Sequence, residues 1–296
     1  MAGLIDTASR VATDLRETAE MIAFKHTVFA LPFAVIALIT AAAPVWPPPR
    51  IWLWVAVAMV SARTAAMAFN RLVDHQIDAA NPRTVGRALP AGRLSRRFAW
   101  LVTAGSSAVF ILAAANLNPL CVVLAPPALA VLLGYSYAKR FTAASHLWLG
   151  VALGMAPIGA WIAVTGRPAW PALVLAGAVC LWVAGFDVIY SLQDERFDRD
   201  HALYSLPARL GGGRSLALAR IFHILAFCGF LAFASAAGGG AIRYSAVVAA
   251  GLILAWQHRL VSADDLRSVD AAFFTANGAL AVCMCVLFVV ARLTGA

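Results

Sequence analysis

The sequence predicts an all-α integral membrane protein, a bundle of about nine transmembrane helices. Its 296 residues are 62% hydrophobic and only 12% charged, and the mean hydropathy is +0.82. A soluble domain of this size could not cover its surface with so few polar groups. Apolar runs of roughly 18 to 22 residues recur along the chain, each long enough for a helix to cross the membrane. Strands are not expected, because the runs do not alternate and lipid tolerates sheets only as closed barrels.

In chain order, the expected helices cover residues 22–43, 51–74, 99–116, 118–137, 146–165, 169–190, 216–236, 242–261 and 272–292. Before them, residues 1–21 place apolar side chains such as Leu4, Ala8 and Leu15 at helical spacing. This spacing predicts an amphipathic helix at the membrane surface, and a solvated tail is the alternative. The whole chain, 1–296, is therefore predicted to form a single membrane domain with a cytoplasmic interfacial segment at 1–21.

The chain carries a formal net charge of +9, and the positions of its 23 basic residues predict its orientation. About seventeen of them fall at the N-terminal side and in the loops after even-numbered helices, against about four on the other side. By the positive-inside rule, the N-terminus and these loops face the cytoplasm, which predicts a multi-pass protein of the inner (cytoplasmic) membrane. Nucleic-acid binding is not expected, because the sequence holds no folded basic module with aromatic platforms.

Two charged segments occupy matching places in the chain. One, "NRLVDHQIDAANPRTVGRALPAG", follows the second expected helix, and the other, "DVIYSLQDERFDRDHALYSLPARLG", ends the sixth. They begin roughly 117 residues apart, and each ends in a turn that contains proline and glycine. This repetition predicts two four-helix halves followed by a ninth helix.

The first charged segment places polar side chains at helical intervals. Asn70, Asp74 and Asp78 follow one another at steps of four, so all three face one side if the helix continues. Arg63, seven residues before Asn70, points the same way. A charge in mid-helix is unfavourable unless it faces a cavity, which favours a functional role over the alternative, an internal structural ion pair.

The second charged segment repeats the pattern with Asp187, Asp194 and Asp198, at steps of seven and four. Two helix ends therefore each present carboxylates along one face. Tyr190, within the same stretch, either anchors the helix at the membrane interface or faces the pocket.

Clustered carboxylates at a membrane edge repel one another unless a cation lies between them. Hard oxygen ligands favour Mg²⁺, which is usually shared between carboxylates and substrate phosphates. The candidate metal-binding and catalytic residues are Asp74, Asp78, Asp187, Asp194 and Asp198. Nearby basic residues suited to phosphate are Arg83, Arg87, Lys139 and Arg140. The alternative for each charged segment is a solvated helix end whose charges only set topology.

These motifs resemble the two aspartate-rich signatures of the UbiA superfamily of membrane aromatic prenyltransferases. The resemblance rests on "NRLVDHQID" with "RTVGRALPAG" and on "DVIYSLQDERFD" with "YSLPARLG", and it covers roughly residues 20–215 well. One departure is Arg71, since many members have an acidic residue directly after the asparagine. The resemblance therefore leaves Asn70, Asp74 and Asp78 as the metal ligands of the first motif.

The resemblance implies a bundle with a central cavity, and a magnesium-bound isoprenyl diphosphate under a cytoplasmic cap. It also implies an aromatic acceptor that is alkylated on a ring carbon. The branch it resembles uses aromatic carboxylates: 4-hydroxybenzoate in ubiquinone-type biosynthesis, or, as the alternative, 1,4-dihydroxy-6-naphthoate in menaquinone biosynthesis. Arg63 is the candidate partner of the acceptor carboxylate. A secondary transporter is the alternative from another class, but the acidic residues cluster at the membrane boundary rather than at the midplane.

Overall fold

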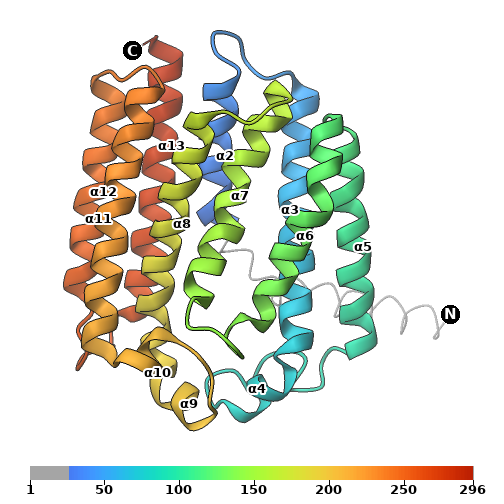
Figure 1. Ribbon diagram of the computed structural model, residues 1–296, viewed down its shortest axis with the longest axis vertical. Helices are drawn as coiled ribbons and strands as arrows, with labels where there is room; N and C mark the ends of the chain where they lie inside the picture. Colours follow the sequence, from blue (N-terminus) through green and yellow to red (C-terminus); the bar gives the residue numbers. More distant parts are fainter. Residues whose placement is uncertain (1–26, 296) are drawn as a thin grey trace, which may run out of the picture.

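The computed structural model describes residues 27–295. Within this range the chain forms only helices and connecting loops (Figure 1). The long helices are α2 (Thr27–Ala41), α3 (Pro49–Val73), α5 (Arg96–Ala115), α6 (Pro119–Ala138), α7 (Ser145–Thr165), α8 (Trp170–Ser191), α11 (Gly212–Ala236), α12 (Ala241–Leu260) and α13 (Asn277–Thr294). A π-helical turn, η3 (Ala271–Ala276), leads into α13. The expected interfacial segment 1–21 lies outside the described residues.

Each expected apolar run corresponds to one of these long helices, so the all-α membrane bundle is confirmed. Seven of the described helices are long and apolar enough to cross a membrane. The other two are α2, with 15 described residues, and α12, with 20 residues. The count of nine membrane crossings therefore stays a prediction.

Four short helical segments lie together at one end of the bundle, below the long helices in Figure 1. They are α4 (His75–Ala80), η2 (Leu192–Asp194), α9 (Glu195–Asp200) and α10 (Leu206–Leu210). We call this end, where α3, α6 and α8 finish, the polar end. The end of α3 and the end of α8 each continue into such a short segment, so the two charged segments of the sequence occupy matching places in the fold.

Local sequence signals set several helix ends. Ser95 and Asn118 cap α5 and α6, because their side chains accept hydrogen bonds from the backbone N–H groups of Phe98 and Cys121. Gly166 ends α7 in the left-handed conformation, with φ of +69°. These caps satisfy backbone groups that the first and last helical turns leave without partners.

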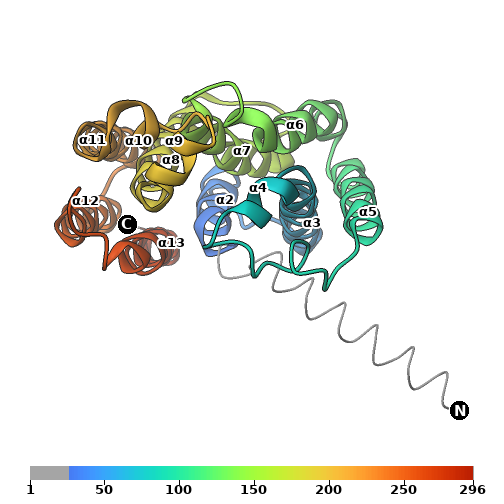
Figure 2. The same ribbon diagram turned by 90° about the horizontal axis from the view of Figure 1, so that it is seen from below.

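Seen from the polar end, the helices form two groups joined by α2 and α7 (Figure 2). One group holds α3, α5 and α6, and the other holds α8, α11, α12 and α13. Glycines let α7 and α8 approach closely, because a Cβ at Gly150 or Gly154 would lie 2.2 or 2.7 Å from the backbone oxygens of Cys180 and Ala176. Such small-residue spacing brings membrane helices into backbone contact.

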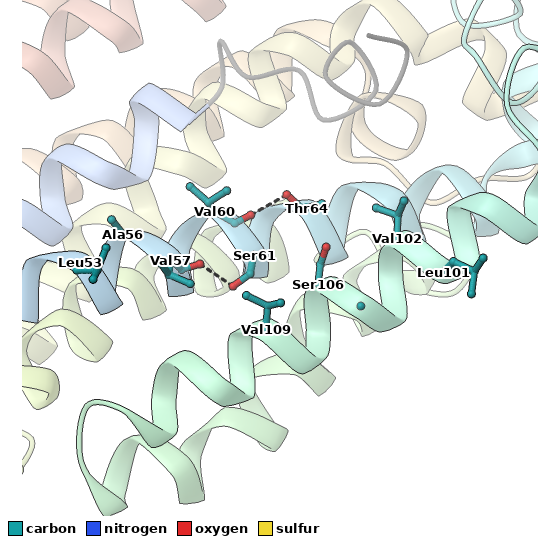
Figure 3. A pocket seen from close by; sticks show the side chains of 11 residues that line it. Leu53, Ala56, Val57, Val60, Ser61, Thr64, Leu101, Val102, Ser106 and Val109 are labelled. Atoms are coloured by element: carbon teal, nitrogen blue, oxygen red, sulfur yellow. Dashed lines mark hydrogen bonds between the residues drawn. The ribbon is translucent and has the colours of Figure 1, made fainter. Parts of the chain in front are cut away.

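An outward groove between α3 and α5 is apolar and lacks charged side chains among its lining residues (Figure 3). Its two hydroxyls on α3 are already used, because Ser61 and Thr64 donate to the carbonyl oxygens of Val57 and Val60 in their own helix. A groove of this composition suits contact with lipid tails and offers no group for chemistry.

Candidate active site

A cavity of about 530 Å³ lies inside the bundle between α3, α6, α7 and α8 and extends to the polar end. Its deeper wall is apolar, with side chains such as Met59, Leu124 and Leu153. Nearly all predicted site residues line it: Arg63, Asn70, Asp74, Asp78, Arg83, Arg87, Lys139, Asp187, Tyr190, Asp194 and Asp198. Arg140 alone among the predicted residues does not. The structure therefore brings the two charged segments, which are far apart in the sequence, together in one chamber, the cavity described above.

The first motif lies at a break in the helix. Helix α3 ends at Val73, and Asp74, with φ of −86° and ψ of 4°, joins it to α4. The assumption that one continuous helix carries all three side chains is therefore wrong, because the helix breaks at Asp74. Backbone hydrogen bonds still link the motif, from Asp74 N–H to Asn70 O at 2.8 Å and from Asp78 N–H to Asp74 O at 2.7 Å. These bonds keep all three side chains on the wall of the cavity.

Asp74 and Asp78 are both 3% exposed, and basic side chains surround them. Asp74 lies 3.6 Å from Lys139 Nζ and 3.1 Å from Arg140 Nη2. Asp78 Oδ1 accepts a hydrogen bond from Arg87 Nη1 at 2.7 Å. Arg71 Nη1 lies 3.8 Å from Asp78 Oδ2. Four cationic side chains therefore surround two carboxylates, which makes the first-motif side of the cavity a suitable place for a further anion.

Arg140 lies behind this wall and holds two helix ends together. Its guanidinium donates to Ser136 O of α6 at 2.9 Å and to Val73 O of α3 at 2.8 Å. Together with its ion pair to Asp74, these bonds make Arg140 a clamp between α3 and α6. The phosphate contact predicted for Arg140 therefore has less geometric support than that predicted for Lys139, which lines the cavity.

The second motif is bonded directly to the loop of the first. Asp194, in the short turn η2, accepts hydrogen bonds from Asn81 Nδ2 at 3.1 Å and from Arg83 Nε at 3.0 Å. Burial lowers the pKa of the Arg83 guanidinium, but its hydrogen bond and charge attraction to Asp194 outweigh this effect and raise the pKa above its ordinary value. Arg83 Nη1 also donates to the hydroxyl of Tyr190, whose ring packs 4.2 Å from that of Phe273. Tyr190 thus faces the cavity.

His146 is a site residue that the sequence argument missed. It is 3% exposed, and its Nδ1 lies 2.7 Å from Asp187 Oδ2. Leu206 N–H donates to His146 Nε2 at 3.3 Å, which places the ring proton on Nδ1. His146 therefore joins the start of α7 to Asp187 on α8 and to the first residue of α10. The available signal was a lone histidine at the start of an apolar run, which sequence spacing does not pair with a residue 41 positions away.

The carboxylates fit a metal ion in part. Among the described residues, no three acidic, histidine or cysteine side chains lie close enough to hold an ion as they stand. Within the same range, however, the buried oxygens Asp74 Oδ1 and Asp78 Oδ2 accept no hydrogen bond and have only ion-pair neighbours, Arg140 Nη2 at 3.1 Å and Arg71 Nη1 at 3.8 Å. Hard carboxylate oxygens without a donor are suited to Mg²⁺, which completes its shell with water and substrate phosphate. Asn70 differs, because its Oδ1 accepts from Arg71 at 3.3 Å while its Nδ2 donates to Asp74 at 2.9 Å.

A helical membrane bundle with paired aspartate-rich segments around a basic chamber defines the class of membrane prenyltransferases. The model of the UbiA prenyltransferase family matches residues 30–279. The chain belongs to this family. It is 32% identical, over 73% of its length and 74% of the relative's, to a 4-hydroxybenzoate octaprenyltransferase of Nitrosospira multiformis. Another enzyme of that name, from Thiobacillus denitrificans, is 30% identical over 76% and 77% of the two chains.

Solved structures agree with the family assignment. The apo structure of a UbiA homolog from Aeropyrum pernix superposes with a TM-score of 0.78 at 33% identity, covering 91% of this chain and 98% of that one. A UbiA homolog from Archaeoglobus fulgidus, solved with DMAPP and Mg²⁺, gives a TM-score of 0.75 and covers 94% and 99% of the two chains. Because its identity to this chain is only 15%, the superposition shows a shared fold and no more. The transporter alternative is set aside, because the family is one of prenyltransferases.

Proposed function

We propose that this protein transfers a polyprenyl group from an isoprenyl diphosphate to a ring carbon of 4-hydroxybenzoate, with Mg²⁺ as cofactor. The observation that carries the proposal is the chamber itself, in which two aspartate-rich segments and a set of basic side chains meet above an apolar interior. The named relatives that are at least 30% identical over about three quarters of the chain support this choice of acceptor.

The chain supplies groups for both ends of the donor. Asp74 and Asp78 from the first motif and Asp194 and Asp198 from the second are the residues that would hold Mg²⁺. Bound Mg²⁺ would stabilise negative charge on the diphosphate as a Lewis acid. Lys139 and Arg87 line the same wall and bind the diphosphate oxygens. The apolar depth of the cavity holds the isoprenyl tail and keeps water from the reacting carbon.

The reaction breaks the allylic C–O bond of the donor and forms a C–C bond to the acceptor ring. Diphosphate leaves with the bonding electrons, and the ring carbon then loses its proton. The basic residues on the first-motif wall lie where the leaving group gains charge, which is the arrangement that lowers the barrier. Arg63, deeper on α3, binds the carboxylate of the acceptor.

The proposal places the polar end of the bundle at the cytoplasmic face of the inner membrane. The basic residues of this end support that orientation by the positive-inside rule, since the loops after α3 and α8 are both rich in arginine. Water-soluble diphosphate then leaves to the cytoplasm, while the prenylated product stays with the membrane.

The test is transfer by the purified protein in lipid nanodiscs. A long-chain isoprenyl diphosphate is supplied with Mg²⁺ and with 4-hydroxybenzoate, 1,4-dihydroxy-6-naphthoate or benzoate, and products are identified by mass spectrometry. We expect a C-prenylated product from 4-hydroxybenzoate and none from benzoate, which lacks the activating hydroxyl. If only 1,4-dihydroxy-6-naphthoate is prenylated, it replaces 4-hydroxybenzoate as the proposed acceptor. If neither of these two phenols is prenylated, the proposed function is contradicted.

A further inference from the structure

Arg71 occupies the last turn of α3 and lines the cavity beside the first motif. Its side chain is 14% exposed. Within residues 27–295, its contacts to protein oxygens are made by Nη1, at 3.3 Å from Asn70 Oδ1 and 3.8 Å from Asp78 Oδ2. A guanidinium carries five N–H donors in a planar fork, so most of this group's donors are left for a ligand.

The positive charge of Arg71 exceeds what its neighbours require. Asp78 is already paired with Arg87 at 2.7 Å, a shorter contact than its 3.8 Å separation from Arg71. Asp74 is in turn paired with Lys139 and Arg140. A largely buried cation whose nearest carboxylate has a better partner is stabilised when an anion joins it.

We propose that Arg71 binds the donor's diphosphate directly, so that part of the diphosphate affinity does not depend on Mg²⁺. This inference rests on the proposed function, because it assigns a further ligand to the same substrate. The guanidinium fork matches two oxygens of a phosphate group, and its position next to Asp74 and Asp78 places it at the wall where the leaving group gains charge.

Arg71 has a second effect through Asn70. By donating to Asn70 Oδ1 it orients the amide so that Asn70 Nδ2 donates to Asp74 Oδ2 at 2.9 Å. If Arg71 were only structural, it would act only through these two hydrogen bonds, and its charge would not matter for binding. A substitution that keeps a donor for Asn70 but removes the charge therefore separates the two roles.

The experiment measures binding of inorganic pyrophosphate by calorimetry, in EDTA and in saturating Mg²⁺. Arg71→Gln removes the charge and retains an N–H donor, whereas Arg71→Lys retains the charge. Arg50→Gln, at the far end of the same helix, is the matched control, since Arg50 donates to Asn116 O away from the cavity. Thermal melting of each variant shows whether it is folded.

We expect the wild-type protein to bind pyrophosphate in EDTA and Arg71→Gln to weaken this binding by about tenfold or more, the range for a lost charged hydrogen bond. Arg50→Gln should stay within about threefold of the wild type, and Arg71→Lys, which keeps the charge but lacks the fork, should bind with an affinity between those of Arg71→Gln and the wild type. Equal metal-free affinity in wild type and Arg71→Gln, or no metal-free binding by the wild type, would overturn the inference. If prenyl transfer occurs while this test fails, only the role of Arg71 is lost; if no transfer occurs, the proposed function is lost instead.

Discussion

Arg63 shows how one charged side chain inside a membrane helix is accommodated. It lies eleven residues before Asp74 on α3, about three helical turns deeper, and it lines the same cavity. A charge at this depth is energetically tolerated only where it faces polar groups or an anionic ligand. Its position suits an acceptor whose carboxylate points into the membrane while its ring lies nearer the diphosphate.

We expect Arg63→Ala to raise the KM for the aromatic acceptor at least tenfold, as expected when a charged hydrogen bond is lost. The KM for the isoprenyl diphosphate should change little, because its diphosphate is bound at the polar end and its tail offers no charge to Arg63. Steady-state kinetics with each substrate varied in turn measure both values. Equal effects on the two substrates in a well-expressed variant would show that Arg63 does not select the acceptor.

Lys139 and Arg140 are adjacent in sequence but have different predicted roles. Lys139 lines the cavity, so Lys139→Ala should lower kcat/KM by an amount equivalent to about 2–4 kcal/mol, the scale of one lost charge-stabilising donor. Arg140→Ala removes the clamp to Ser136 O and Val73 O, so it should also lower the melting temperature. Kinetics and thermal melting of both variants provide the comparison. Two identical profiles would show that the clamp and the cavity contact are not separate.

At the scale of helices, close packing of α7 against α8 fixes where His146 and Asp187 meet. Gly150→Ala would place a Cβ 2.2 Å from Cys180 O, so the two helices must move apart. We expect this substitution to destabilise the protein by about 1–3 kcal/mol, as overpacking does. Gly177→Ala on α8 is the control, because a Cβ there meets nothing within 4 Å. Thermal melting of the two variants decides the point, and equal stability would contradict the packing argument.

The helices themselves were predictable because their signals are local. Apolar runs long enough to span a membrane and steps of four between aspartates are read directly from neighbouring residues. The breaks at Asp74 and at Leu192–Asp194 were not, since both stretches keep helical spacing and lack proline. These breaks turn the ends of α3 and α8 into the short helices that close the chamber at the polar end.

The hydrogen bonds that cross the cavity between the two motifs could not be predicted from the sequence either. Asn81 and Arg83 reach Asp194, 113 and 111 positions away, and His146 reaches Asp187. Such pairs depend on how helices pack, and no periodicity encodes them. The repeated charged segments indicated that the two motifs correspond, and the chamber lined by both agrees with that prediction. The metal ligands and catalytic roles of the individual aspartates stay predictions.

For the whole molecule, the charge distribution predicts which end faces the cytoplasm. Val85 belongs to the loop after α4 and Val45 to the loop before α3, and both side chains are exposed. These two loops lie at opposite ends of the bundle (Figure 1). We introduce a cysteine at each position in a background that lacks the five native cysteines. In spheroplasts, a membrane-impermeant maleimide should label Val45→Cys at once and Val85→Cys only after permeabilisation. The reverse pattern would place the active site outside.

In the proposed reaction, the two aspartate-rich segments act together on a magnesium-bound diphosphate. This joint action is tested by measuring prenyl transfer by Asp74→Asn and Asp194→Asn, one from each segment, in nanodiscs with Mg²⁺ titrated from zero. Each change removes one negative charge and keeps the size of the side chain, so the fold should be retained in thermal melting. We expect the wild type to need Mg²⁺ and each variant to lose at least about a hundredfold in kcat/KM, the scale of a lost charge-stabilising group. Transfer at the wild-type rate by either folded variant, or transfer that is unchanged in EDTA, would contradict the claim.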